Sequence, residues 1–237
     1  LRRYRWLPHL LIAMTLFAIL AGIGLIRFIE SRFVEATGGE LTLAAAEVAE
    51  KLDRMLFERQ GDALMMARVL GSRTSDPRYL SEYLQWMKKE HSPIYLSLAV
   101  MDVQGRVVAA TEPSLVGRDH SGAASFIAAR ATRRLDIADV AGQGAESGVD
   151  TVMFTAPILD SEGMFLGVVT SRVGVPFLEE VATRTIRSLE DRAGAGVRVE
   201  YQMLTRQGRV FVDSGLPHQE AINLKEFGLS SVLLSEA

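Results

Sequence analysis

The chain contains no cysteine among its 237 residues. Disulfides, thiolate metal sites and a cysteine nucleophile are therefore excluded, and the redox compartment stays open. The four histidines are scattered, and none has the spacing of a metal-binding motif such as H-E-x-x-H. The chain also lacks an excess of positive charge, since its net charge is −3. We therefore expect no nucleic-acid partner.

Catalytic and cofactor motifs are missing as well. Gly142, Gly144 and Gly148 resemble a dinucleotide loop, but their spacing is wrong by one residue and a strand follows instead of a helix. No serine lies in a G-x-S-x-G nucleophile elbow. Three aspartates fall at hairpins, where aspartate favours turns, namely Asp102, Asp160 and Asp213. We expect neither enzymatic activity nor a cofactor or metal site in this fragment.

One long apolar run is present near the start. Leu10 to Ile26 contains no charged residue, and with Leu7 and Pro8 it approaches the roughly 20 residues that a bilayer requires. Three arginines precede the run and a mixed set of charges follows it, which predicts a cytoplasmic N-terminus and an extracytoplasmic remainder. The alternative is a cleaved signal peptide, whose apolar core would be shorter, about 7–15 residues. We favour an uncleaved anchor in the inner membrane.

The stretch from Phe28 to Leu70 has helical periodicity. Apolar residues recur at steps of four and three on one helix face, at Leu41, Ala45, Val48, Leu52 and Met55. Such a stripe fits either a plain core helix or a stalk that pairs with a second copy. We favour the stalk, and with it a homodimer.

A short hairpin pattern occurs twice. Leu96 to Thr111 and Tyr201 to Ser214 both consist of apolar segments on either side of the tetrapeptide Gln-Gly-Arg-Val. A repeated supersecondary unit predicts two related modules in tandem. The elements predicted between the hairpins, and just before the first, are helices from Asp76-Pro77 to about His91, at 121–133 and from Pro176 to Gly194, and strands at 136–141, 152–159 and 164–173.

The order of these elements resembles the double Cache sensor domain, the PAS-like extracytoplasmic module of bacterial receptors. The matching pieces are the anchor, the long helix, Met101 to Val107, Gly117 to Asp119, Phe126 to Ala129, Thr155 to Gly163 and Gly167 to Val169. The resemblance implies an α+β fold with a transmembrane helix, a stalk helix and tandem antiparallel-sheet modules. The implied boundaries are 1–27 for tail and anchor, 28–75 for the stalk, 76–196 for the membrane-distal module and 197–237 for a truncated second module.

The resemblance also implies a function, the sensing of an extracytoplasmic ligand for a histidine kinase, a diguanylate cyclase or a chemoreceptor. By position, the candidate ligand-binding residues are Arg118, Phe126, Arg130, Asp139, Thr155 and Thr170. The arginines would favour a small organic ligand with a carboxylate. Of the motif by which family members bind amino acids, this sequence retains only the aromatic residue, at Phe126. Thr170 and Arg172 lie in the region where those members usually have an acidic residue. A membrane-tethered hydrolase and a structural stalk remain the alternatives.

Overall fold

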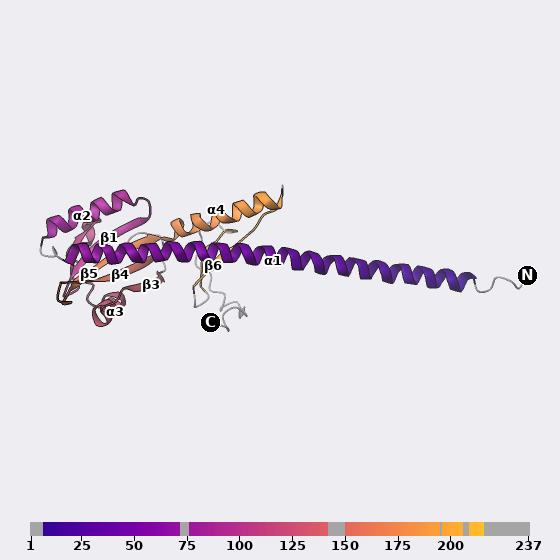
Figure 1. The fold of residues 1–237 in the computed structure, drawn as a ribbon, viewed down its shortest axis with the longest axis horizontal. Coiled ribbons are helices and arrows are strands. Elements are labelled where there is room, and N and C mark those ends of the chain that lie inside the picture. Colours follow the sequence, from indigo (N-terminus) through magenta and orange to yellow (C-terminus); the bar gives the residue numbers. More distant parts are fainter. Residues whose placement is uncertain (1–6, 72–75, 142–149, 195, 206–208, 216–237) are drawn as a thin grey trace, which may run out of the picture. The chain divides into compact units, whose positions relative to one another are not determined.

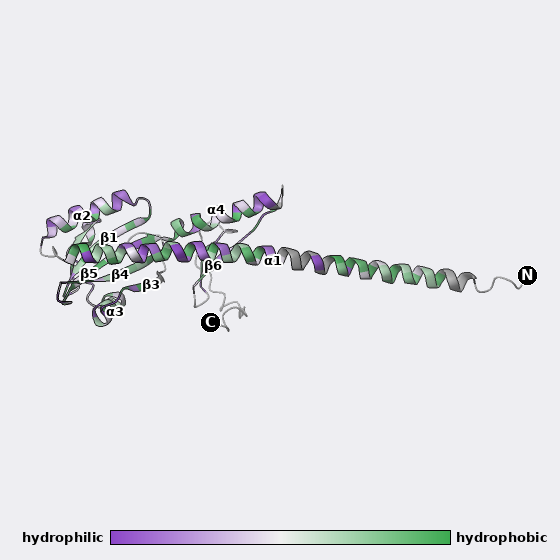
Figure 2. Ribbon diagram, viewed as in Figure 1, coloured by the Kyte–Doolittle hydropathy of each residue, from purple (hydrophilic) through white to green (hydrophobic). Residues whose placement is uncertain are grey.

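The structure is a computed structural model that describes residues 7–71, 76–141, 150–194, 196–205 and 209–215. It divides into two compact units, residues 1–49 and residues 50–237. Helix α1 (Leu7–Gly71) belongs to both. In the first unit, Ile12–Ile29 is long and apolar enough to cross a membrane, with a mean hydropathy of 2.3, and Figure 2 shows it as an almost unbroken apolar stretch.

The second unit is built on a five-stranded antiparallel sheet in the order β2-β1-β5-β4-β3. Its strands are β1 (Tyr95–Asp102), β2 (Val107–Ala110), β3 (Asp136–Ala141), β4 (Thr151–Leu159) and β5 (Phe165–Gly174). The hairpin predicted at Leu96 to Thr111 is therefore present as β1 and β2, and the strands predicted at 136–141, 152–159 and 164–173 are present to within one residue. Figure 1 shows the sheet beside the helices, and the mixed helix and antiparallel-sheet fold class is confirmed.

The helices of the second unit differ in how they begin, since a capping side chain is present at α2 (Pro77–Glu90) but not at the three that follow it. Helix α2 starts at Asp76, whose carboxylate accepts the backbone N–H groups of Arg78 and Tyr79. The others are the short η1 (Pro113–Leu115), α3 (Ala124–Thr132) and α4 (Val175–Ala193). A separate two-stranded sheet follows, formed by β6 (Gln202–Leu204) and β7 (Val210–Asp213). The turn residues Gln207 and Gly208 of the second hairpin lie outside the described residues, and the module boundaries stay a prediction.

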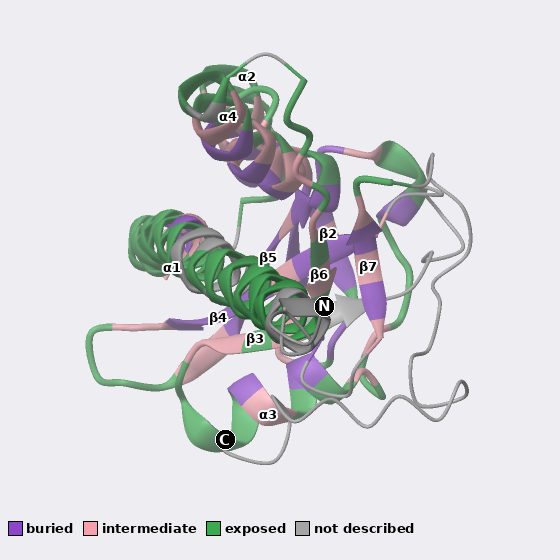
Figure 3. Cartoon of the chain, turned by 90° about the vertical axis from the view of Figure 1, so that its right-hand side faces the viewer, coloured by how far each residue is buried: buried purple, intermediate pink, exposed green. Residues whose placement is uncertain are grey.

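Two apolar clusters lie on the two faces of the large sheet. The larger cluster joins the last turns of α1 and the buried face of α2 to the sheet, through residues such as Met66, Leu84 and Leu98. The smaller one joins Phe126 and Ala129 of α3 to the opposite sheet face. Figure 3 shows the resulting buried strands between exposed helix surfaces. The sheet face beneath α3 therefore carries the smaller of the two apolar clusters.

The apolar stripe of α1 packs differently from our expectation. Met55 is buried in the larger cluster and Leu52 packs against it, so in this part of the helix the stripe faces the chain's own sheet. The plain core helix was the correct alternative for these two residues. Periodicity alone could not decide, because it identifies an apolar face but not the surface that covers it.

Candidate functional site

Strand pairing places one row of side chains on the sheet face beneath α3. Successive cross-strand partners from β2 to β3 are Ala110, Ala99, Thr170, Thr155 and Asp136. Val168, two residues before Thr170, packs in the same cluster as Phe126 of α3. Because side chains alternate along a strand, Thr170 and its partners also lie on the α3 side. The row therefore consists of small side chains, with Asp136 at one end.

The two threonines of this row are buried, but their hydroxyl groups lack good hydrogen-bond partners among the described residues. The Thr155 side chain is 1% exposed, and its hydroxyl has no hydrogen-bond partner among the described residues. Thr170 is 6% exposed, and its hydroxyl donates a long bond of 3.4 Å to the Ala99 carbonyl. An unsatisfied buried hydroxyl costs about 1–3 kcal/mol. A polar ligand that reaches the Thr155 hydroxyl would supply the missing partner.

The next row toward the end of β5 carries a cation. Arg172 pairs with Ser97 of β1 and Met153 of β4, and it is half-buried. Residues two apart on a strand are separated by about 7 Å, so the Arg172 and Thr170 side chains stand next to each other on this face. On the other flank, the half-buried carboxylate-bearing Asp136 stands opposite Thr155. The face therefore combines hydroxyls, one cation and one carboxylate.

The structure brings together only part of the predicted site. Thr155 and Thr170 share the face, and Phe126 lies buried against it with its ring edge-on to Phe165 at 6.1 Å between centroids. Arg118 is exposed, and its Nε donates to the Ser114 carbonyl of its own turn at 3.0 Å. Arg130 lies on the exposed side of α3. For all of these, a role in ligand binding stays a prediction.

Two further observations complete the comparison with the prediction. Asp139 belongs to β3, but its side chain is outside the part of the chain that the structure describes. Asp136 was not predicted, and Arg172 was noted only as a departure from a motif. The spacing of two residues between Thr170 and Arg172 was the available signal for a shared strand face.

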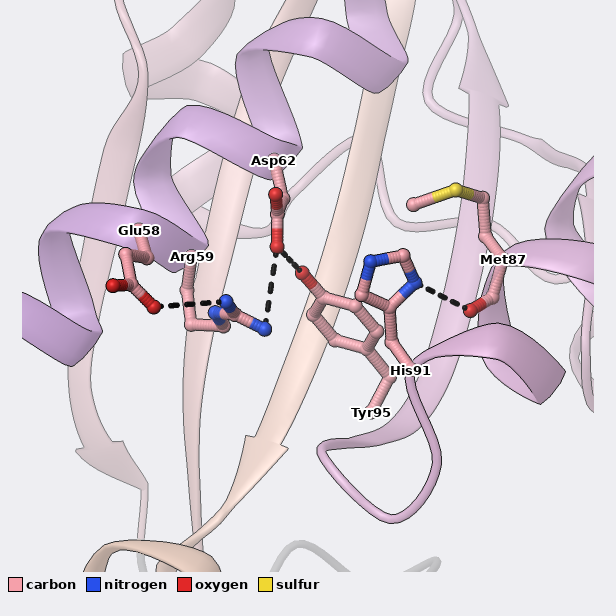
Figure 4. A network of polar contacts seen from close by, with 6 residues as sticks. All are labelled: Glu58, Arg59, Asp62, Met87, His91 and Tyr95. Carbon is pink, nitrogen blue, oxygen red and sulfur yellow. Dashed lines mark hydrogen bonds and ion pairs between the residues drawn. The ribbon is translucent and has the colours of Figure 1, made fainter.

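A second polar cluster lies on the opposite side of the sheet, between α1 and the start of β1 (Figure 4). Arg59 is 8% exposed and forms ion pairs with Glu58 and Asp62, each at 3.3 Å. The Tyr95 hydroxyl donates to the same Asp62 carboxylate at 2.6 Å. The Nε of Arg59 has no hydrogen-bond partner among the described residues. This cluster ties α1 to the sheet, with part of the guanidinium left unsatisfied.

Burial is the main cause of a raised pKa at the Tyr95 hydroxyl. The hydrogen bond to Asp62 and the negative charge of that carboxylate act in the same direction, because both disfavour the phenolate. The nearby Arg59, whose guanidinium lies 5.8 Å from the ring centroid, opposes them. Tyr95 is therefore a neutral hydrogen-bond donor at ordinary pH. Among the described residues, no group of three His, Asp or Glu side chains is placed to hold a metal ion.

Comparison with known proteins gives likeness in structure alone. No protein-family model and no curated protein matches the sequence. An extracellular ligand-binding receptor from Desulfohalobium retbaense matches with a TM-score of 0.60 and 19% identity, over 79% of this chain and 34% of the receptor. The ligand-binding domain of the Pseudomonas aeruginosa amino-acid chemoreceptor PctC, in complex with GABA, matches with 0.54 and 19%, over 71% of each chain. The sensor domain of the Vibrio cholerae histidine kinase DctB matches with 0.52 and 14%, over 78% and 67%.

At these identities the likeness establishes the fold. This chain spans about a third of the Desulfohalobium receptor, 34% of its length. The chain therefore has the PAS-like fold of Cache-type extracellular sensor domains.

Proposed function

We propose that this chain is the extracytoplasmic ligand-sensing input module of a membrane-anchored receptor. The observation that carries the proposal is the Thr155 hydroxyl, which is 1% exposed and lacks a partner among the described residues, on the α3-covered face of a sensor-type sheet.

The ligand proposed is a small organic molecule with a carboxylate. Arginine binds carboxylates through paired N–H donors, and Arg172 stands beside the two threonines. Asp136 at the other flank adds an acceptor for a donor group on the ligand. The PctC domain, which shares the fold, was solved with GABA, a small molecule of this class. Arg118 and Arg130 are exposed and are less suited to a desolvated ion pair.

The receptor proposed around this module is a homodimer in the inner membrane. Ile12–Ile29 supports an anchor, and the arginines before it support a cytoplasmic N-terminus. The output domain is a histidine kinase, a diguanylate cyclase or a chemotaxis signalling domain, in line with the resemblance to double Cache receptors. The activity of the whole protein is part of the proposal.

Thermal unfolding of the detergent-solubilised chain against a panel of organic acids tests this proposal. A ligand at 100 times its dissociation constant stabilises the folded state by about 2.7 kcal/mol. Thr155→Val retains the side-chain shape but removes the hydroxyl, so this variant should fold as well as the parent and lose the ligand-induced shift. Thr132→Val, on the exposed last turn of α3, is the matched control and should retain it. The absence of a shift with every acid would contradict a carboxylate ligand.

A further inference from the structure

Two buried polar groups outside the face beneath α3 lack hydrogen-bond partners among the described residues. One is the Arg59 side chain of α1, whose Nε and Nη1 atoms are both buried and unpaired, although Nη1 lies 3.3 Å from an Asp62 oxygen. The other is the hydroxyl of Ser171 in β5, a residue that is 0% exposed. Buried polar groups without partners cost free energy, so folded proteins normally supply a partner to each.

Ser171 lies on the side of the sheet that α1 covers. Its neighbours two residues away, Val169 and Val173, both belong to the larger apolar cluster, which contains the buried face of α1. Because side chains alternate along a strand, the Ser171 hydroxyl is on the same face as these valines. The adjacent Thr170 and Arg172 are on the opposite face, beneath α3.

Arg59 and Ser171 also lie at the same level of the sheet. Helix α1 and strand β4 end side by side, because a Cβ added at Gly71 would lie 2.5 Å from the Leu159 carbonyl oxygen. Arg59 precedes Gly71 by about 18 Å along the helix. The same length along β4 is roughly five residues, which leads from Leu159 back to Phe154, the cross-strand partner of Ser171.

The contacts of Arg59 agree with this level. Its guanidinium lies 5.8 Å from the centroid of the Tyr95 ring, and Tyr95 pairs with Val173, which is next to Ser171 on the same strand face. Figure 4 shows the guanidinium between Glu58 and Tyr95, in front of the strands. The unpaired groups therefore border one buried polar region between α1 and β5.

We propose that this region is a binding site for ordered water. We call it the α1–β5 water site, and its residues are Arg59, Asp62, Tyr95 and Ser171. A water molecule accepts a hydrogen bond from the Arg59 Nε–H and donates one to the Ser171 hydroxyl or the Asp62 carboxylate, which gives it the two to four polar partners that buried water requires. The site is separate from the proposed ligand face, since the sheet lies between them.

A small anion is the alternative occupant, and the charges of the cluster disfavour it. Glu58 and Asp62 both form ion pairs with Arg59, so negative charge already exceeds positive charge here. The Nε–H and the Nη1–H bonds also point from different edges of the planar guanidinium, so one anion cannot accept both. Uncharged water molecules can serve the two edges separately.

The water site gives β5 a polar link to α1. Ser171 stands between Thr170 and Arg172, whose side chains face the proposed ligand, and Arg59 belongs to the helix that contains the apolar span. A displacement of β5 would reach α1 through hydrogen bonds to water, which can be exchanged without loss of core packing. This consequence rests on the proposed function, whereas the water site itself rests on the contacts of Arg59 and Ser171.

The sign of one substitution tests the water site, measured by thermal unfolding of the detergent-solubilised chain. With water bound, Ser171→Ala removes a hydrogen-bonded hydroxyl, and Tm should fall by about 2–4 °C, the shift for one lost hydrogen bond in a chain of this size. With no water, the same substitution removes an unpaired buried hydroxyl, and Tm should rise. A raised or unchanged Tm would overturn the proposal.

A second substitution tests whether the hydroxyl and the guanidinium share the water. Arg59→Met removes one partner of the water, so in that background Ser171→Ala should lower Tm by less than half as much as in the parent. Ser97→Ala is the matched control, since Ser97 is 5% exposed and pairs with Arg172 on the opposite face. It should have the same effect in both backgrounds. Equal effects of Ser171→Ala in the two backgrounds would contradict a shared site.

A crystal structure of the same chain, grown with bromide in place of chloride, gives a readout that does not depend on stability. We expect an ordered water about 2.7–3.2 Å from both the Arg59 Nε and the Ser171 Oγ atoms. Anomalous bromide scattering at that position, or no density there, would refute the assignment. These experiments use no organic ligand, so failure of the water site is distinguishable from failure of ligand sensing.

Discussion

Three aspartates, Asp102, Asp160 and Asp213, accept backbone hydrogen bonds in three separate turns. In each, the Oδ1 atom accepts a backbone N–H two residues later, at 2.9 Å for Gln104, Glu162 and Gly215. Asp102 and Asp160 also accept a second N–H four residues later, at 3.0 and 2.7 Å. Turn formation accounts for these carboxylates, which agrees with the sequence-based interpretation that they are not catalytic.

Replacing Asp160 by alanine should destabilise the folded chain by about 1 kcal/mol, because two backbone N–H groups lose their acceptor. Glu162→Ala in the same turn removes a more exposed carboxylate, which accepts no backbone N–H among the described residues, and should change stability by less than about 0.5 kcal/mol. Urea unfolding followed by circular dichroism measures both variants. Equal effects would mean that charge, not turn geometry, accounts for the loss.

The raised pKa of Tyr95 predicts loss of stability in alkali. The hydroxyl keeps its proton more tightly in the folded chain than in the unfolded chain, where the ordinary pKa is 10.0. The stabilisation is therefore complete below pH 10.0 and declines as the pH rises above that value. Tyr95→Phe should be less stable than the parent at about pH 7. Between about pH 9 and about pH 11, the range around the ordinary tyrosine pKa, it should lose less stability than the parent. Unfolding curves at several pH values test the slope.

Among the elements, α1 and β1 are joined by the cluster of Arg59, Asp62 and Tyr95. Removing one partner of a buried ion pair leaves the other charge less well compensated, and without Asp62 the only ion-pair partner of Arg59 among the described residues is the more exposed Glu58. Asp62→Ala should therefore cost about 3 kcal/mol, the lower end of the usual range, because this carboxylate is partly exposed. Arg59→Met combined with Asp62→Leu removes both charges and should cost much less.

Chemical unfolding of the single and double variants measures the difference between them. If Arg59→Met with Asp62→Leu is as unstable as Asp62→Ala, then packing and not charge pairing holds this part of α1 against the sheet.

Local signals in the sequence were sufficient to predict most helices and strands, but not which of them pack against one another. Asp76 and Pro77 identify the start of α2, and Gly105, with φ of +86°, marks the first hairpin. A side chain at Gly105 would lie 2.6 Å from the Ser121 Cα, so glycine is required there on two grounds. These are effects of a few adjacent residues, and short segments of sequence contain them.

The site depended on contacts that no short segment contains. The row from Ala110 to Asp136 exists only because β1 pairs with β5 and β4 lies between β5 and β3. Thr155 and Thr170 were predicted from a family resemblance, whereas Arg172 joins them through strand pairing. Arg118 was placed in the site by its position in a loop, where a bond to the Ser114 carbonyl holds it at the surface.

For the whole molecule, the proposed topology predicts which residues reagents outside the cell can reach. Lys89→Cys, exposed on α2, should react with a membrane-impermeant maleimide in intact spheroplasts. Arg3→Cys, ahead of the apolar span, should react only after the membrane is permeabilised. The reverse pattern of labelling would show that the orientation is inverted.

The strand order of the sheet also constrains how the chain is made. The central strand β5 is the last of the five to be synthesised, and it pairs with β1, the first. Ala99 and Thr170, partners in that pairing, are 71 residues apart in the chain. Until the ribosome has released β5, the edge of β1 that β5 will cover is unpaired. Contacts of such long range form slowly, so the nascent chain must pass through a period in which an open apolar strand can pair with a neighbouring chain.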